Sequence, residues 1–396
     1  MRKTAIWPKE RLEKLVQFSS GGTPSKANPE FWQGNIPWIS AATMHQQEIV
    51  TSDLHISEDG LKAGSKLAKK NDLLLLVRGS MLWNKVPICI CKRDVAFNQD
   101  VKALSIIGNI IPMYLLYWFL AHQRVLLNKV VGTGIGAGKF DLDELKKLDI
   151  LLPSLPEQKA IADLLSTWDE TIEKTERLIE AKEAKLKGQI QKLISQRCDS
   201  WPHTKPKKIF DTITEKNFPD EELLSVTQDR GVIPRSMLEG RVMSPDGTTA
   251  SYKLIKRGDF AISLRSFQGG IEYSNYQGII SPAYTVLRPK IELSSDFYRL
   301  FFKSYIFIEK YLNLAVIGIR DGKQISIPDF LSIKIPVPPL EQQKDIAETL
   351  SVCQHEIDLL KQLADKYKTQ KRGLMQKMLT GEWRIKPEIV NQYREA

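Results

Sequence analysis

The feature of this sequence that most constrains its fold is an internal repeat. Residues 158–162 (QKAIA) recur as residues 343–347 (QKDIA), a displacement of 343 − 158 = 185 residues. The same displacement still relates Gln191 to Gln376, so the match runs without a gap between these points. A match of this length in one register indicates that the chain contains two copies of one structural unit.

Shorter matches extend the repeat into the segments that precede each copy. Their displacements drift by a few residues, as loop insertions require. The matched pairs are Trp7-Pro8 with Trp201-Pro202, residues 66–72 (KLAKKND) with 253–259 (KLIKRGD), and residues 134–139 (GIGAGK) with 318–323 (GIRDGK). The whole chain is therefore a tandem duplication of a globular unit followed by a long segment.

The long segments have the apolar spacing of a coiled coil. In the first copy Ile161, Leu165, Trp168 and Ile172 follow alternating steps of four and three. The seam continues at steps of seven, because polar residues interrupt it, at Ile179, Leu186 and Leu193. The second copy repeats the pattern with Lys371 as its polar interruption. Helices of about 40 residues would be about 60 Å long. A pseudo-two-fold relation between the copies predicts that the helices lie antiparallel. Gly188 and Gly373 would permit their close approach, with a glycine tolerated near a fraying helix end as the alternative.

These patterns predict an α+β protein built as a tandem duplication of a β-containing domain plus a long helix. The two long helices form an antiparallel coiled coil with pseudo-two-fold symmetry. The apolar run at residues 110–120 is too short to cross a membrane and predicts a buried, aromatic-rich helix. The expected boundaries are residues 1–150 and 200–333 for the domains, 155–197 and 340–380 for the helices, and 381–396 for a C-terminal tail.

The composition indicates the class of binding partner and the cellular compartment of the protein. The chain has 57 Lys and Arg against 47 Asp and Glu, a formal charge of +10, and a pI near 9.2. Such an excess favours a polyanionic partner, although many cytosolic proteins carry one without binding nucleic acid. The four cysteines form neither a CxxC pair nor a zinc pattern, and no signal peptide is recognised at the N-terminus. A cytoplasmic protein with reduced thiols is expected.

Several segments resemble one known family, the specificity subunits of type I restriction-modification systems of prokaryotes. The proline-then-EQ starts of the two long helices are the most specific of them, and the resemblance extends over nearly the full chain. The segments are residues 21–40 (GGTPSKANPEFWQGNIPWIS), 96–104 (AFNQDVKAL), 281–287 (SPAYTVL), 155–166 (LPEQKAIADLLS) and 339–351 (PLEQQKDIAETLS).

The resemblance implies a mechanism in which this chain selects the DNA sequence and catalyses nothing. Each target-recognition domain would read one half of a bipartite, asymmetric site in double-stranded DNA, and the helix pair would set the unread spacer. Two methyltransferase subunits would bind the helical region, and motor-nuclease subunits would complete the restriction enzyme. No cofactor is expected in this chain, because S-adenosylmethionine would be bound by the methyltransferase.

The candidate DNA contacts follow from the chemistry of base and phosphate recognition. Arg and Lys suit guanine, Asn and Gln suit adenine, and basic or hydroxyl side chains bind phosphates. The candidates are Thr23, Lys26, Arg78, Asn98, Gln99 and Lys139 in the first domain, and Arg230, Arg265, Gln268, Arg320 and Lys323 in the second.

Structural interpretations of these residues remain open. Arg78 follows the apolar run at residues 73–77 and could instead form a salt bridge, and Asn98 and Gln99 could hold a turn. Arg230 could belong to a solvated turn. Ser281 aligns with Asn98, so the amide pair is absent from the second copy.

The resemblance also implies candidate residues for the methyltransferase interface, at the matched helix starts. They are Gln158, Lys159, Gln343 and Lys344, for which helix capping or solvent exposure is the alternative. The aromatic residues near Tyr117 and Phe301 are expected in the core rather than stacked on bases.

The motifs expected of an enzyme are incomplete. GTGIGAGKF at residues 132–140 lacks the first glycine and the final hydroxyl of a phosphate loop, and no Asn/Asp-Pro-Pro-aromatic motif is present. The alternative to a DNA-reading subunit is a duplicated helical scaffold without DNA readout.

Overall fold

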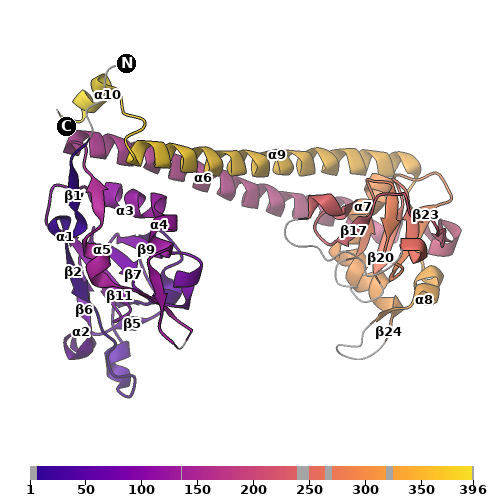
Figure 1. Ribbon diagram of the computed structural model, residues 1–396. Helices are drawn as coiled ribbons and strands as arrows, with labels where there is room; N and C mark the ends of the chain where they lie inside the picture. Colours follow the sequence, from indigo (N-terminus) through magenta and orange to yellow (C-terminus); the bar gives the residue numbers. More distant parts are fainter. Residues whose placement is uncertain (1–6, 135, 239–248, 264–269, 318–323, 395–396) are drawn as a thin grey trace. The chain divides into compact units, whose positions relative to one another are not determined.

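The computed structural model describes residues 7–134, 136–238, 249–263, 270–317 and 324–394 (Figure 1). Arg265, Gln268, Arg320 and Lys323 lie outside these ranges. The chain divides into two compact units, a first unit of residues 1–175 with 363–396 and a second unit of residues 176–362. Each unit therefore contains one globular domain and parts of both long helices.

The domain of the first unit is built on two sheets. Leu73, Leu74, Leu75 and Leu76 are fully buried, which explains the continuous apolar run of β7 as a strand covered on both faces. The five-stranded sheet has the order β2 (Val16–Ser20), β11 (Val101–Ile106), β7 (Leu73–Leu76), β9 (Ile88–Cys91), β4 (Glu48–Ile49). The four-stranded sheet has the order β5 (His55–Ile56), β3 (Ile36–Ile39), β10 (Val95–Phe97), β6 (Lys66–Ala68).

The domain of the second unit has one larger sheet and several two-stranded ribbons. Its core is aromatic, with Phe260 and Phe302 at a ring-centroid distance of 5.2 Å. The sheet has the order β16 (Phe210–Ile213), β23 (Tyr284–Pro289), β20 (Phe260–Ser263), β21 (Ile271–Tyr273). The ribbons pair β17 (Leu224–Thr227) with β18 (Gly231–Pro234), β19 (Lys253–Ile255) with β22 (Gly278–Ile280), and β24 (Val316–Ile317) with β25 (Gln324–Ile325).

The repeated KKND and KRGD motifs form the same turn in both domains. The Asp72 carboxylate accepts a hydrogen bond from the Lys69 backbone N–H at 2.9 Å, and Asp259 accepts one from Lys256 at 2.9 Å. The residue before each aspartate is left-handed, with φ of 74° at Asn71 and 96° at Gly258. Because Asn and Gly tolerate this conformation, the two motifs specify one turn with different residues.

The apolar run at residues 110–120 forms the predicted buried helix. It corresponds to α3 (Pro112–Ala121), which begins with a proline in its first turn, and residues 114–119 are buried. The aromatic helix of the second domain, α7 (Ser295–Lys303), also buries Tyr298, Phe301 and Phe302. Both predictions of core packing are confirmed. Among the residues described, no helix combines the length and the apolar character needed to span a membrane.

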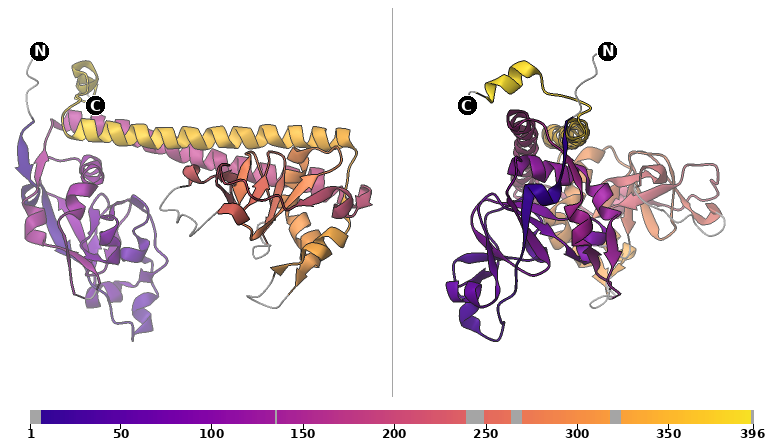
Figure 2. Two further views of the ribbon diagram at one scale, coloured as in Figure 1. Left: turned by 45° about the vertical axis from the view of Figure 1, so that its right-hand side comes forward. Right: turned by 60° about the vertical axis from the view of Figure 1, so that its left-hand side comes forward.

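The long helices are α6 (Leu155–Ile190) and α9 (Leu340–Leu379), which lie side by side in both views of Figure 2. In the first unit, Trp168 packs edge-on against Tyr367 at 5.7 Å and Asp169 pairs with Lys371. In the second unit, Lys182 pairs with Glu356 at 2.6 Å and Glu183 with Lys361 at 2.6 Å.

The helices run in opposite directions within the first unit. Glu157 of α6 contacts Arg384, just beyond the end of α9, and further along α6 Asp169 contacts Lys371, nearer the start of α9. The predicted seam is also confirmed, because Ile161, Leu165, Ile172, Ile179 and Leu186 are all buried. The fold is therefore α+β with an antiparallel helix pair.

The glycines of the long helices do not mark a close approach. A Cβ atom added at Gly188 or Gly373 would meet no described atom within 4 Å. The prediction that these residues let the helices approach closely is therefore wrong. Gly381 has a different role: its φ of 74° is left-handed, and it follows the end of α9.

The four cysteines are free thiols. Burial raises the pKa of Cys89 to about 12 and that of Cys198 to about 11. Thiols with raised pKa values are poor nucleophiles at neutral pH, so these two side chains serve in packing.

Candidate nucleic-acid interface

A three-stranded ribbon brings two predicted DNA contacts side by side. The ribbon has the order β12 (Val130–Gly132), β13 (Gly138–Phe140), β8 (Arg78–Gly79). Lys139 lies directly opposite Arg78 on one side and opposite Val131 on the other. Residues directly opposite in an antiparallel pair project from the same face. Val131, Lys139 and Arg78 therefore form one row across the ribbon, which we call the ribbon row.

The two faces of this ribbon differ in polarity. Phe140 is buried with a relative exposure of 1%, whereas Val131, which lies opposite Lys139, is 54% exposed. Trp83 anchors the turn of the ribbon, because its indole N–H donates to the backbone oxygen of Gly136 at 2.9 Å. Alternation along a strand thus turns the ribbon row to solvent while the opposite face joins the core.

The ribbon row holds two cations without a matching acid. In the part of the chain that the structure describes, Arg78 and Lys139 make no ion pair within 4.0 Å. Like charges placed directly opposite each other destabilise a strand pair. An anionic partner would remove this repulsion, so the arrangement favours the DNA interpretation of Arg78 over a structural salt bridge.

The same edge of the domain continues to Gln99 and Thr23. The Val77 N–H donates to the Asp100 oxygen at 2.9 Å, which places Gln99 close to Arg78 across neighbouring chain segments. Gln99 is exposed, and its Oε1 accepts a hydrogen bond from Thr23 Oγ1 at 2.8 Å. Thr23 and Gln99, which are distant in sequence, therefore form one polar pair beside the ribbon.

The neighbouring amide, Asn98, has a different environment. Its side chain is buried, with a relative exposure of 8%, and its Oδ1 accepts from the Asp100 N–H at 3.1 Å. Asn98 therefore holds the turn between β10 and β11, the structural alternative to the predicted DNA contact. Lys26 is exposed in a loop of the same domain, and its predicted contact remains a prediction.

Arg230 lies in the turn between β17 and β18. It is exposed, and its guanidinium donates to the Met237 oxygen at 3.1 Å while lying 3.7 Å from the Asp229 carboxylate. Lys303 stabilises the turn by donating a hydrogen bond to the backbone oxygen of Gln228 at 3.0 Å. Lys303 also pairs with Glu272, a carboxyl whose pKa is raised by burial. Arg230 thus projects from a well-held turn, compatible with either of its interpretations.

The second domain carries a counterpart of the first ribbon, in a register that the sequence motif misses. The GIGAGK and GIRDGK motifs align Lys139 with Lys323. The structure instead pairs Val316 with Ile325 and Ile317 with Gln324, just as Val130 pairs with Phe140 and Val131 with Lys139. By this pairing the counterpart of Lys139 is Gln324.

Helix caps confirm this register. Each ribbon ends immediately before an N-cap residue, Asp141 for α5 (Leu142–Lys146) and Ser326 for α8 (Ile327–Ser332). The displacement is 326 − 141 = 185, equal to 324 − 139 = 185 and to that of the long helices. Ile317 and Gln324 were not among the predicted site residues, because the motif alignment was shifted by one residue.

The glutamines predicted to contact the methyltransferase are buried within the monomer. Gln158 is 1% exposed, its Oε1 accepts from the Ile111 N–H at 2.9 Å, and its Nε2 donates to the oxygens of Asn109 and Pro153. Gln343 is 2% exposed, and its amide joins the Ser294 N–H to the Pro338 oxygen. Each glutamine fastens a domain to the start of its helix, and this burial replaces the predicted partner contact.

The lysines that follow these glutamines are exposed. Lys344 is open to solvent, whereas the ammonium group of Lys159 lies 5.6 Å from the ring centre of Tyr393. Tyr393 follows the C-terminal helix α10 (Pro387–Gln392), and its pKa is raised by burial and by the nearby Asp163 carboxylate. Both lysines remain candidates for a partner surface, and the C-terminal segment shares the surface of Lys159.

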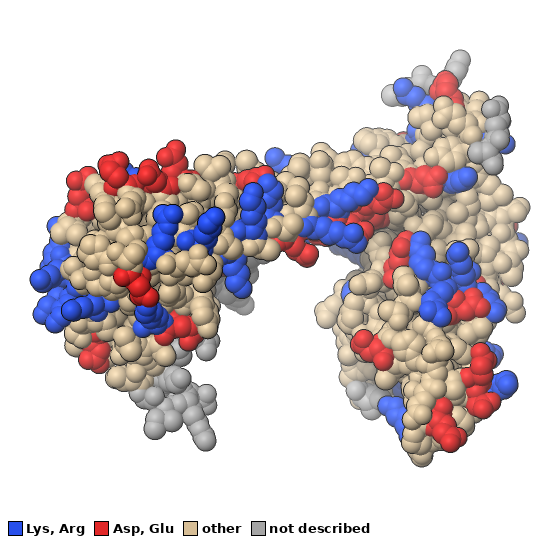
Figure 3. Space-filling model, turned by 180° about the vertical axis from the view of Figure 1, so that it is seen from behind, with Lys and Arg blue, Asp and Glu red and all other residues tan. Residues whose placement is uncertain are grey.

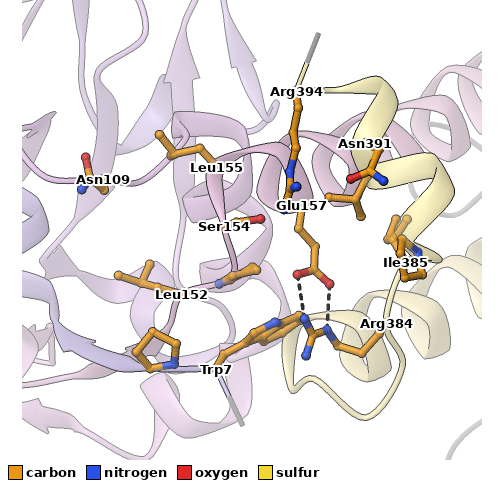
Figure 4. Close-up of a pocket in the computed structure, with 14 residues that line it drawn as sticks. Trp7, Asn109, Leu152, Ser154, Leu155, Glu157, Arg384, Ile385, Asn391 and Arg394 are labelled. Carbon is orange, nitrogen blue, oxygen red and sulfur yellow. Dashed lines mark hydrogen bonds and ion pairs between the residues drawn. The ribbon is translucent and has the colours of Figure 1, made fainter. Parts of the chain in front are cut away.

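The C-terminal segment is fixed to the start of α6 by an ion pair. Figure 4 shows the Arg384 guanidinium facing Glu157, with hydrogen bonds of 2.7 and 2.8 Å, and Arg384 lies 4.6 Å from the centre of the Trp7 ring. A cavity of about 650 Å³ lies beside them. Glu157 therefore binds the C-terminal segment.

Charge alone does not locate an interface. In Figure 3, basic and acidic side chains are interspersed along the long helices and over the face shown. Within the described ranges, no group of three His, Cys, Asp or Glu residues is placed to hold a metal ion. The ribbon row is a local feature that the net charge does not reveal.

Comparison with known proteins identifies relatives, one of which matches nearly the whole chain. The chain is 26% identical over 418 residues to the MjaVIII type I restriction enzyme specificity subunit of Methanocaldococcus jannaschii, covering 98% of this chain and 95% of that protein. It is 31% identical over 160 residues, 40% of each chain, to the EcoR124I/EcoR124II specificity subunit of Escherichia coli.

Two solved structures have the same fold. The specificity subunit of a type I restriction-modification system from M. genitalium has a TM-score of 0.57 and 18% identity, with 96% of this chain and 98% of that chain covered. A chain from a structural study of type I complex assembly and conformational transition has a TM-score of 0.58 and 14% identity, with 97% and 100% covered.

A family model decides the classification. The model described as the type I restriction modification DNA specificity domain matches residues 6–183 and 246–368, one match in each copy of the repeat. These two matches include both ribbons and most of both long helices. The chain belongs to the family of type I restriction-modification specificity subunits.

Proposed function

We propose that this chain is the sequence-reading subunit of a type I restriction-modification complex and that its two domains read the two halves of a bipartite DNA site. The family match in both copies of the repeat carries the proposal. The ribbons support an asymmetric site, because the exposed polar residue is Lys139 in the first domain and Gln324 in the second. Different side chains at matched positions require different half-sites.

The long helices provide the spacer and the docking surface in this proposal. Two methyltransferase subunits bind near the exposed helix starts, close to Lys159 and Lys344. They supply S-adenosylmethionine and the methyl transfer, and motor-nuclease subunits complete the restriction enzyme in the cytoplasm. This chain contributes the choice of site and no catalytic group.

Genome-wide mapping of methylated adenines tests the proposal. Cells that express the chain with its cognate methyltransferase should methylate a split motif with a fixed spacer. Deletion of this chain alone should abolish methylation at that motif, because the methyltransferase then lacks its sequence reader. An unchanged methylation pattern, with expression of both proteins confirmed, would contradict the proposal.

Salt dependence distinguishes the alternative of a scaffold without DNA readout. Binding through phosphate contacts releases counterions, so the affinity of the methyltransferase complex for duplex DNA should fall steeply as salt is raised. A complex that assembles on the chain but shows no salt-dependent affinity for duplex DNA would favour the scaffold.

A further inference from the structure

The two ribbons present equivalent pairs of side chains to solvent. On the first ribbon the pair is Val131 with Lys139, and on the second it is Ile317 with Gln324. We call each of these a reading pair. The large apolar member is exposed in both domains, to 54% at Val131 and 52% at Ile317.

The strands leave these side chains no place in the core. Phe140 and Ile325, the residues that follow Lys139 and Gln324, are buried with exposures of 1% and 3%. Because side chains alternate along a strand, Lys139 and Gln324 must face away from the core. Val131 and Ile317 lie directly opposite them and share that outer face.

A single exposed aliphatic residue on a protein surface needs no explanation. Here a β-branched side chain stands beside a hydrogen-bonding one at matched positions of two domains whose loops otherwise differ. The positions are matched by strand pairing and by the caps Asp141 and Ser326. The recurrence indicates that both copies use this face for the same task.

Base edges in the major groove of DNA match this combination. The groove admits a β-ribbon, and its base pairs present hydrogen-bonding groups beside the thymine methyl group. Lysine donates to the O6 and N7 atoms of guanine, and glutamine pairs with the N6 and N7 atoms of adenine. An aliphatic side chain suits the thymine methyl.

We propose that the two reading pairs insert into the major groove at matched positions of the two half-sites, where Lys139 selects guanine and Gln324 selects adenine. Val131 and Ile317 contact a neighbouring thymine methyl. In the first domain Arg78 continues the row and contributes a second donor. This inference rests on the proposed function and adds to it the residues that set one base in each half-site.

Trp83 is the positioning residue of the first reading pair. Its indole N–H holds the backbone of Gly136, and its ring lies 3.8 Å from the position of a Cβ atom on Gly132. Replacing the indole with alanine would free the turn and leave the chemistry of Lys139 unchanged. Trp83→Ala should therefore weaken discrimination at the guanine position, whereas Trp83→Tyr should retain part of it.

An exchange of the two polar residues tests the proposal directly. We would map methylated adenines in cells that carry the chain with its methyltransferase, comparing wild type with Lys139→Gln, Gln324→Lys and the control Lys62→Gln. Lys62 is exposed on α2 (Glu58–Gly64) and loses the same charge. Lys139→Gln should change one guanine position in one half-site, and Gln324→Lys should change one adenine position in the other.

A second measurement is needed in case a variant complex no longer methylates DNA. The affinity of the intact complex would be measured for duplexes in which each base pair of the half-site is replaced in turn. For Lys139→Gln, the wild-type discrimination of about tenfold or more at the guanine position should fall to about twofold or less. All other positions should keep their preference.

The outcomes separate this inference from the proposed function. An unaltered motif in both variants would overturn the inference. A uniform loss of affinity across all duplexes, with a salt slope reduced by about one, would indicate phosphate contact and would also overturn it. In either case a motif that depends on the wild-type chain leaves the proposed function intact. If no motif depends on the chain at all, the proposed function itself is wrong.

Discussion

At the scale of single residues, Gln158 and Gln343 show how a polar side chain in a repeated motif can serve the fold. Both amides are buried and bonded to the backbone that enters the helix, from Pro153 in one copy and Pro338 in the other. The resemblance to type I specificity subunits assigned both glutamines to a partner contact, with helix capping or solvent exposure as the alternative. Whether a polar residue at a helix start is buried depends on the domain that packs against the helix, and the spacing of residues along the helix does not predict this packing.

Replacing Gln158 with alanine should destabilise the first unit. The change leaves the Ile111 N–H and the Asn109 and Pro153 oxygens without their partner, and an unsatisfied buried polar group costs about 1–3 kcal/mol. We expect a loss of at least about 2 kcal/mol, measured by urea denaturation of the purified chain. The matched control is Lys159→Ala, an exposed neighbour expected to change stability by less than about 0.5 kcal/mol.

The same two variants separate stability from partner binding. If Gln158→Ala were as stable as Lys159→Ala, the structural role of the glutamine would be refuted. Lys159→Ala should instead weaken assembly with the methyltransferase, measured by titration of the two purified proteins. Unchanged assembly would remove Lys159 from the proposed interface.

At the scale of elements, a partly buried ion pair joins the helices to the first domain. Lys371 of α9 is 8% exposed and pairs with Asp169 of α6, while the Tyr117 hydroxyl of α3 donates to the same carboxylate at 2.8 Å. The Lys371 ammonium also lies 5.2 Å from the centre of the Tyr117 ring. Burial raises the pKa of Tyr117, so its hydroxyl stays protonated and remains a donor. This group fixes three helices in one register.

Removing one member of that ion pair should cost more than removing both. Lys371→Met leaves the Asp169 charge partly buried without its cation, which we expect to cost about 2 kcal/mol of unfolding free energy. The double variant Lys371→Met with Asp169→Leu replaces the pair with apolar contacts and should recover most of that loss. Urea denaturation of the single and double variants measures the difference. An additive result, in which the double variant is less stable than either single one, would contradict this account.

The more exposed pair Lys182–Glu356 is the control for the pair of Lys371 with Asp169. Its side chains are 29% and 47% exposed, so solvent screens the interaction and Lys182→Met should cost less than about 1 kcal/mol. A cost as large as that of Lys371→Met would show that the exposure of the pair does not decide its contribution.

Elements also show what could be predicted from sequence and what could not. The helix seam was predictable because a spacing of three and four residues directly places Ile161 and Leu165 on one face. The register of the second ribbon could not be predicted in this way, because the glycine-lysine motif aligns Lys139 with Lys323. Strand pairing aligns it with Gln324, since hydrogen bonds to the partner strand fix register and the motif letters do not.

At the scale of the whole molecule, the duplication could be predicted from the sequence because the long helices of both copies share one displacement. The DNA contacts were harder to predict from the sequence. Of those in the first domain, Arg78 and Lys139 meet across β8 and β13, whereas Asn98 turns into the core. Loop residues are brought together by contacts distant in sequence, such as the hydrogen bond from Thr23 to Gln99, and no local pattern encodes them.

Exchange of one whole domain tests the modular use of this duplication. The two ends of the first domain pair with each other: β1 (Lys9–Arg11) lies antiparallel to β14 (Asp149–Leu151), just before α6 begins. Residues 1–150 can therefore be replaced by those of a relative with a different motif. Gln158 keeps its bond to the Pro153 oxygen, and the backbone of the relative must supply the groups that Asn109 and Ile111 offer here. We expect methylome mapping to show one half-site replaced, the other half-site kept, and the spacer unchanged, because both long helices are retained. A change in both half-sites would mean that the domains do not read DNA independently, and a changed spacer would mean that the helices alone do not set it.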